Sequence, residues 1–154
     1  MKTGFSNRMK DVFTFVREEV IRLGHSSIKV EHLFLGILRD GGGSAIKVLK
    51  NLDVEPADLK TIIENTIKNN LVHNNVRSNE ISFSKQAERV LKKSILERKN
   101  LSEDEIKTIH VLLSILLDDN NIITTTLKHL HIDYEIILEE YQSLNINISS
   151  EDKT

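Results

Sequence analysis

The sequence of 154 residues contains two copies of one unit, and this repeat constrains the fold more than any other feature. A shift of 78 positions aligns the halves without a gap and superimposes Phe5–Phe83, Ser6–Ser84, Val12–Val90, Glu19–Glu97, Leu23–Leu101, Ile28–Ile106, Lys29–Lys107, His32–His110, Leu35–Leu113, Ile37–Ile115, Leu38–Leu116, Asp40–Asp118, Leu49–Leu127, Lys50–Lys128 and Leu52–Leu130. Chance seldom holds one register over such a length, so we interpret the chain as a duplicated structural unit.

The first copy has the apolar periodicity of helices. Apolar residues recur at three- and four-residue spacings over 9–23, which is typical of one helix face. Ser6 is the expected N-cap of this helix, and Gly24 is its expected C-terminal stop. A second helix is expected over 31–39, central and buried because apolar residues nearly encircle it. Glycines 41–43 should end it.

The other segments predict six further helices. A third helix is expected over 44–51, and a fourth starts near Pro56, whose missing N–H is not needed in a first turn. The predicted buried face of the fourth helix comprises Leu59, Ile62, Ile63 and Ile67. The second copy is predicted to form helices over 84–100, 108–118, 122–130 and 133–144. No segment alternates with period two for long enough to predict a sheet.

The predicted fold class is therefore all-α. Two tandem four-helix repeats, 5–68 and 81–144, are expected to pack about a pseudo-twofold axis as one domain of eight helices. The polar, Asn-rich segment 69–80 is the expected linker between them. Residues 145–154 are expected to form a polar tail or linker.

Composition excludes several classes of function. The chain has no cysteine, which excludes thiol catalysis, disulfides and thiolate zinc sites. Its 21 Lys and Arg against 23 Asp and Glu give a net charge of −2, which argues against a dedicated nucleic-acid or anionic-membrane binder. Neither a signal peptide nor a run of roughly 18 apolar residues is seen, so a soluble, cytoplasmic protein is expected.

The motifs of common active sites are missing from the sequence. There is no GxxxxGK[ST], GxSxG or HExxH pattern, so we predict no enzyme activity and no metal in this chain. Adjacent carboxylates such as Glu18 and Glu19 diverge on a helix and are expected to be solvated. A basic stripe on the fifth helix is interpreted as a solvent face, or else as a docking surface for an acidic partner; it comprises Lys85, Arg89, Lys92 and Lys93.

Glu31 has two interpretations. It stands at the start of the second helix, where the positive end of the helix dipole stabilises a carboxylate by about 0.3–1 kcal/mol. Alternatively, it is an exposed carboxylate that captures a guanidinium or ammonium group of a partner.

The segment 22–52, RLGHSSIKVEHLFLGILRDGGGSAIKVLKNL, resembles the signature of the Clp N-terminal repeats, with a "GH…EHLLLGLL" block, a glycine loop and a "KVL..L" block. The duplicated architecture over about 5–144 is similar too, although IKTIHVLLSILLDD at 106–119 is degenerate. Within the family, the block over 22–43 looks most like the ClpC type. The resemblance implies an all-helical pseudo-dimer that stands on a hexameric AAA+ unfoldase ring and recruits substrates or adaptor proteins.

The resemblance also implies phosphoarginine binding, in which an "EH" glutamate contacts the guanidinium and a helix start with Ser or Thr receives the phosphate. The matching residues of this chain are Ser6, Asn7, Glu31, His32, Ser84 and Thr108, and the pocket pairs Glu31 with the Ser6 helix end. The second glutamate position is Ile109, which cannot pair with a guanidinium, so one of two symmetric pockets should be lost or weakened. Val30 also replaces the usual Thr.

The predicted function is a substrate- and adaptor-recognition domain that delivers proteins for ATP-dependent unfolding and degradation. This chain needs no cofactor, since the resemblance places ATP and Mg in downstream modules. The implied partners are protein substrates, adaptors, the AAA+ hexamer and a ClpP-type peptidase, without nucleic acid or membrane. The alternative is a free-standing adaptor or regulator. A nucleic-acid binder using the basic stripe is also conceivable, whereas no residue pattern supports an enzyme acting on small molecules.

Overall fold

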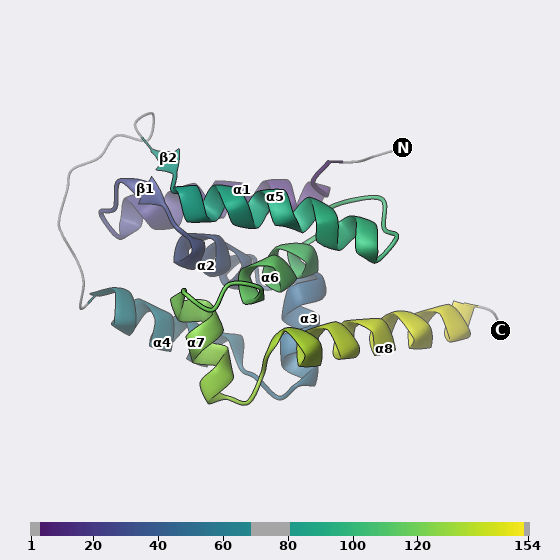
Figure 1. Cartoon of the computed structure of the whole chain (residues 1–154). Coiled ribbons are helices and arrows are strands. Elements are labelled where there is room, and N and C mark those ends of the chain that lie inside the picture. The colour runs from purple at the N-terminus through teal and green to yellow at the C-terminus, as the bar shows by residue number, and fades with distance from the viewer. Residues whose placement is uncertain (1–3, 69–80, 153–154) are drawn as a thin grey trace.

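The computed structural model describes residues 4–68 and 81–152, with side chains described as far as residue 145. These ranges contain eight helices in two sets of four, which confirms the predicted all-α class (Figure 1). The first set is α1 (Asn7–Arg22), α2 (Val30–Asp40), α3 (Gly43–Asn51) and α4 (Pro56–Lys68). The second set is α5 (Lys85–Asn100), α6 (Thr108–Leu116), α7 (Ile122–His129) and α8 (Tyr134–Asp152).

Local capping explains where the first helix of each repeat begins. The Ser6 hydroxyl accepts a hydrogen bond from the Met9 backbone N–H at 3.1 Å, and the Ser84 hydroxyl accepts one from Ala87 at the same distance. Each bond satisfies a backbone donor that the first helical turn leaves free. The predicted stop is confirmed as well, because Gly24 follows the cap of α1 with a φ of 71°.

A two-stranded parallel sheet joins the two repeats, and the sequence did not predict it. Strand β1 (Ser27–Ile28) pairs with β2 (Ser82–Phe83), and an isolated bridge pairs Phe5 with Ile106. The repeat register superimposes Phe5 on Phe83 and Ile28 on Ile106, so the two pairings are pseudo-symmetric. Each repeat therefore hydrogen-bonds its own start to the loop before the other repeat's central helix. Strands of two residues are too short to show a period-two pattern.

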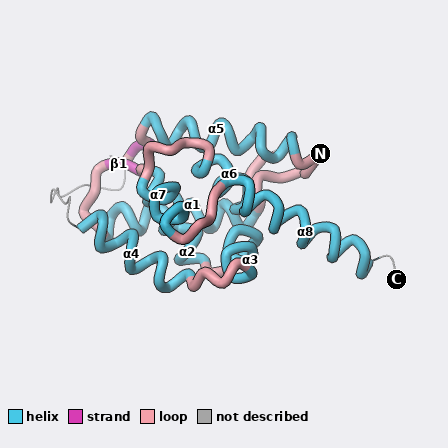
Figure 2. The backbone as a smooth tube through the Cα atoms, turned by 60° about the horizontal axis from the view of Figure 1, so that its bottom comes forward, coloured by secondary structure: helices cyan, strands magenta, loops and turns pink. Residues whose placement is uncertain are grey.

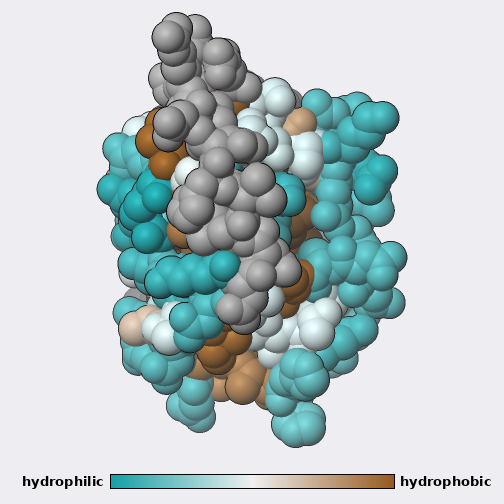
Figure 3. Space-filling view, turned by 90° about the vertical axis from the view of Figure 1, so that its left-hand side faces the viewer, coloured by the Kyte–Doolittle hydropathy of each residue, from teal (hydrophilic) through white to brown (hydrophobic). Residues whose placement is uncertain are grey.

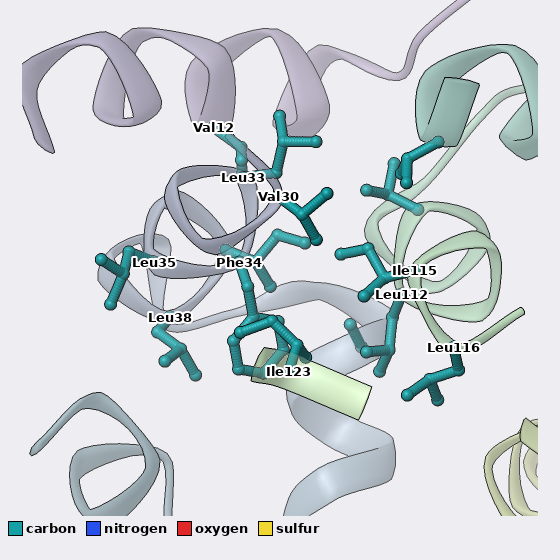
Figure 4. Close-up of a cluster of buried hydrophobic side chains, with 14 of the residues drawn as sticks. Val12, Val30, Leu33, Phe34, Leu35, Leu38, Leu112, Ile115, Leu116 and Ile123 are labelled. Carbon is teal, nitrogen blue, oxygen red and sulfur yellow. The ribbon is translucent and has the colours of Figure 1, made fainter. Parts of the chain in front are cut away.

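The core lies around α2 and α6, the second helix of each repeat. Figure 4 shows Val30 and Phe34 of α2 on the side toward Leu112 and Ile115 of α6, with Ile123 of α7 beside Phe34. All five are fully buried. The prediction of a central second helix is confirmed, since every residue of α2 from His32 to Leu38 is buried.

Three details differ from the sequence-based expectation. Ile62 was assigned to the buried face of α4 but is 43% exposed. Helix α8 continues past the expected end at Leu144 to Asp152, because no glycine or proline follows to stop it; Figures 1 and 2 show this end projecting beyond the other helices. Glu19 is buried rather than solvated, with salt bridges to Arg22 and Arg39. The predicted linker 69–80 lies outside the described residues.

Candidate functional site

A small hollow opens at the start of α2. Its volume is about 110 Å³, and its walls come from the loop before β1, the first turn of α2, the end of α4 and the start of α7. The lining residues are His25, Lys29, Glu31, Thr66, Ile67 and Ile122. The space suits one polar side-chain group rather than a large ligand.

Glu31 supplies the carboxylate of this hollow. It stands in the first turn of α2 and is half-buried. Among the described residues, its side chain makes no hydrogen bond or salt bridge. The partial positive charge of the helix start stabilises the carboxylate there. The side chain thus stands at the wall of a hollow, where its carboxylate is available to a cation.

The helix start that adjoins Glu31 belongs to Ser84, not to Ser6. The Ser84 N–H donates to the Ile28 carbonyl at 2.9 Å, immediately before α2. The Ser6 N–H donates to the Ile106 carbonyl at 3.0 Å, immediately before α6. The pairing of Ser6 with Glu31 was therefore wrong. The start of each repeat pairs with the loop before the central helix of the other repeat, and this places each serine beside the other repeat's central helix.

The pseudo-symmetric position beside Ser6 is filled by the protein itself. The Thr108 hydroxyl accepts a hydrogen bond from the Ala45 N–H at 3.1 Å, and the Ser44 hydroxyl accepts one from the Ile109 N–H at 3.3 Å. Helices α3 and α6 thus cap each other's N-termini. Ile109 is fully buried, so the counterpart of Glu31 belongs to the core.

Arg8 closes the same position from outside. Its guanidinium forms a 2.6 Å salt bridge with Asp40 and packs over the glycine backbone that leads into α3. A Cβ at Gly42 would lie 2.5 Å from Arg8 Nη1, and a Cβ at Gly43 would lie 2.7 Å from Arg8 Cδ. A side chain at either glycine would therefore displace the arginine from its observed position. Asn7, another predicted site residue, is exposed at the start of α1 on this closed side.

His32 is a buried support beneath the open hollow. Its Nδ1 accepts a hydrogen bond from the Lys29 N–H at 2.8 Å, and its Nε2 lies 2.6 Å from His25 Nδ1. Burial, together with the smaller effects of the charges of His25 and Lys29, lowers the pKa of His32 to about 3. The ring is neutral, so with Nδ1 accepting, Nε2–H donates to His25. Neither ring nitrogen is left for a ligand.

Sequence reasoning missed several residues around the hollow. His25 and Lys29 lie on either side of β1, Ile122 begins α7, and no local motif marks the three as neighbours. Lys29 could have been found from the repeat. Lys29 and its equivalent Lys107 each stand three residues before a histidine that accepts a hydrogen bond from the lysine N–H. The contacts of the other two residues depend on long-range packing.

Two further properties follow from the described ranges. None of the helices there has the length and apolar character needed to cross a bilayer. Nor do three potential metal-ligating side chains gather anywhere within 4–68 and 81–145.

Known structures share this fold. The Hsp104 N-terminal domain from Candida albicans is similar with a TM-score of 0.76 at 18% identity, covering 92% of this chain and 91% of that chain. A ClpV N-domain solved in complex with VipB peptide is similar with a TM-score of 0.66 at 16% identity, covering 88% of both chains.

Curated relatives are similar in sequence. The ClpA homolog of Guillardia theta, named an ATP-dependent Clp protease ATP-binding subunit, is 32% identical over 129 residues, or 84% of this chain. The negative regulator of genetic competence ClpC/MecB of Bacillus subtilis is 29% identical over 126 residues, or 82% of this chain. This chain spans only 15% of the length of each. The model of the Clp repeat (R) N-terminal domain matches residues 4–143, and the chain therefore belongs to that family.

Proposed function

We propose that the chain is the recognition domain of a ClpC-like AAA+ unfoldase, and that it captures substrates and adaptors for ATP-dependent unfolding and degradation. Family membership over 4–143 supports this role. The matched relative of Guillardia theta is named an ATP-binding subunit of a protease, and this chain corresponds to 15% of it. We therefore assign ATP chemistry, the hexameric ring and a ClpP-type peptidase to parts of the machine beyond these residues.

Peptide capture is consistent with the fold. The similar ClpV N-domain was solved with a peptide bound, so a domain of this shape can present a binding surface to a polypeptide. In this chain the open hollow at α2 is the site we assign to a charged side chain of the bound protein. The opposite pseudo-symmetric position is occupied by internal groups, which leaves one such site.

We propose that the open hollow recognises phosphoarginine. The Glu31 carboxylate, which has no partner within the described part of the chain and carries the proposal, would accept hydrogen bonds from the guanidinium. The start of α5, with Ser84 and Lys85, adjoins α2 through the bond from Ser84 to Ile28 and offers positive potential to the phosphate. Lys29, which lines the hollow, adds a positive charge.

Calorimetric titration with free phosphoarginine tests this assignment. A charge-assisted hydrogen bond contributes about 1.5–3 kcal/mol, so Glu31→Gln should weaken binding at least about tenfold. Asn7→Ala, on the closed side, is the matched control and should bind like the wild type. Unchanged affinity of Glu31→Gln, or equal binding of unphosphorylated arginine, would refute the phosphoarginine site.

A further inference from the structure

A second, larger groove lies between α4 and α7, and we call it the α4–α7 groove. It consists of two hollows of about 600 and 500 Å³ that share Ile62 and Leu130. Each of these two side chains is 43% exposed, so the apolar floor at the centre of the groove is accessible. Figure 3 looks onto the end of the molecule that carries α4 and shows hydrophobic surface between hydrophilic flanks.

The Asp and Glu side chains that line the α4–α7 groove are concentrated at one of its ends. Asp53, Glu55 and Asp58 line the hollow at the start of α4. Asp119 lines the other hollow, where Lys128 neutralises it at 2.8 Å. Among the described residues, no Lys or Arg side chain lines either hollow. The groove therefore has an apolar centre and an acidic end.

From this arrangement we propose that the α4–α7 groove binds a basic amphipathic polypeptide segment. Its apolar side chains would cover Ile62 and Leu130, and its Lys or Arg residues would face Asp53, Glu55 and Asp58. Two hollows in series suit apolar side chains from successive turns of one helix. An acidic rim repels anionic lipid surfaces and nucleic-acid phosphates, so complementary charge selects a basic protein segment. This inference rests on the role in protein recognition proposed above, but not on phosphoarginine.

The groove also adjoins the Glu31 hollow. Thr66 and Ile122 line both, so a polypeptide in the α4–α7 groove passes next to the start of α2. A single substrate segment can therefore contact the Glu31 carboxylate and the apolar floor together. The two contacts remain separable, because Ile62 and the acidic end lie outside the Glu31 hollow.

Fluorescence anisotropy with a labelled synthetic helix tests the proposal. The peptide carries Leu along one face and Lys at one end, contains no phosphoarginine, and is compared with a version in which every Lys is Glu. Ile62→Gln should weaken binding of the Lys peptide by roughly tenfold, because it removes one aliphatic contact. Leu96→Gln on α5 is the matched control, since Leu96 is also exposed on a helix but lies outside both hollows.

The triple variant Asp53→Asn, Glu55→Gln, Asp58→Asn tests the charge. Asp53 has a φ of 62°, which asparagine tolerates, so the fold should be retained, as circular dichroism would show. The variant should lose the preference for the Lys peptide and most of the salt dependence of its binding. Equal binding of Lys and Glu peptides by the wild type, or unchanged affinity in Ile62→Gln, overturns the proposal. Phosphoarginine titration of Ile62→Gln reports separately on the Glu31 site.

Discussion

The two repeats hold equivalent buried histidines with different partners. In both, the histidine Nδ1 accepts a hydrogen bond from a lysine N–H at 2.8 Å, which fixes the start of the central helix. In the first repeat the other ring nitrogen meets His25 at 2.6 Å. In the second it meets the carboxylate of Glu103 at 3.2 Å, which occupies the position of His25 in the repeat register.

Glu103 is paired with several groups of its own repeat. Its carboxylate also accepts hydrogen bonds from the Tyr141 hydroxyl at 2.7 Å and from Lys107 Nζ at 3.0 Å. Burial by itself would raise the pKa of Glu103, but the hydrogen bonds from His110, Tyr141 and Lys107 outweigh it and lower the pKa to about 2. The carboxylate of Glu103 is thus paired within its own repeat.

The comparison suggests how duplication divided two roles. The first repeat keeps Glu31, whose carboxylate has no partner among the described residues, above a neutral histidine pair and beside an open hollow. The second places Ile109 at the equivalent position, fully buried. One copy is thus arranged to meet a ligand, and the other to fill the core. Five substitutions, in three exchanges of features between the repeats, test how the two copies differ.

The largest expected effect comes from Ile109→Glu, which gives the second repeat the glutamate of the first. An unpaired carboxylate in a fully buried position should lower the free energy of unfolding by about 3–5 kcal/mol. Urea denaturation measures this change. The reverse exchange, Glu31→Ile, removes only a favourable helix-end charge and should cost no more than about 1 kcal/mol. Similar losses in the two variants would contradict the division.

The second-largest expected effect is a loss of stability caused by a substitution at the contact of α1 with α2. A Cβ at Gly36 would collide with Val16 Cγ2 and lie 3.1 Å from the Val12 carbonyl. At the equivalent place in the second repeat, Ser114 donates to the Val90 carbonyl at 2.6 Å. Gly36→Ser should therefore destabilise the protein by about 1–3 kcal/mol through overpacking.

A second substitution separates overpacking from a general effect of serine. The residue equivalent to Val16 is the smaller Ser94, which leaves room for a side chain at position 114. Val16→Ser added to Gly36→Ser should therefore cost less than the sum of the two single changes, measured by a double-mutant cycle in urea. Strict additivity would show that steric conflict at Val16 is not the cause.

The smallest expected effect is a change in pH dependence. The pKa of His32 in the fold is about 3, below its ordinary value of 6.5. The unfolded chain then binds the proton more readily, so stability present above pH 6.5 is lost as pH falls toward 3. At pH 5 this loss amounts to about 2 kcal/mol relative to pH 7.

His25→Glu supplies the partner found in the second repeat and should reduce this loss, because a carboxylate favours protonated His32. Comparing the unfolding free energies of variant and wild type at pH 7 and pH 5 measures the difference. Glu103 does not obscure the result. Its contribution is present above its ordinary pKa of 4.5 and is lost only between pH 4.5 and about 2. An equal drop in both proteins would show that His32 is not the responsible group.

Features that depend on neighbouring residues were predictable from the sequence. Ser6 caps α1, Gly24 ends it and Pro56 begins α4, as the sequence indicated, and the equivalent Ser84 caps α5. These contacts act within a single turn, so sequence distance and spatial distance coincide. The repeat also indicated two sets of four helices, because equal apolar patterns bury equal faces.

The geometry of the site could not be derived that way. Duplication leaves open whether Glu31 meets the serine of its own repeat or that of the other. In the structure Glu31 adjoins Ser84 of the other repeat, because the Ser84 N–H donates a hydrogen bond to the Ile28 carbonyl just before α2. Ile62 likewise matches the apolar pattern of α4, yet it borders an open groove because α7 covers only part of that helix.

The sequence by itself thus determined the helices and their duplication. It also showed that only one of two equivalent positions, Glu31 and Ile109, carries a glutamate. The tertiary structure alone decided which groups meet at that glutamate and which apolar face stays accessible. The physical reason is the distance along the chain over which each kind of interaction acts. Helix propensity and capping act over a few residues, whereas the hollow at Glu31 is assembled from segments as far apart as His25 and Ile122, whose meeting depends on how whole helices pack.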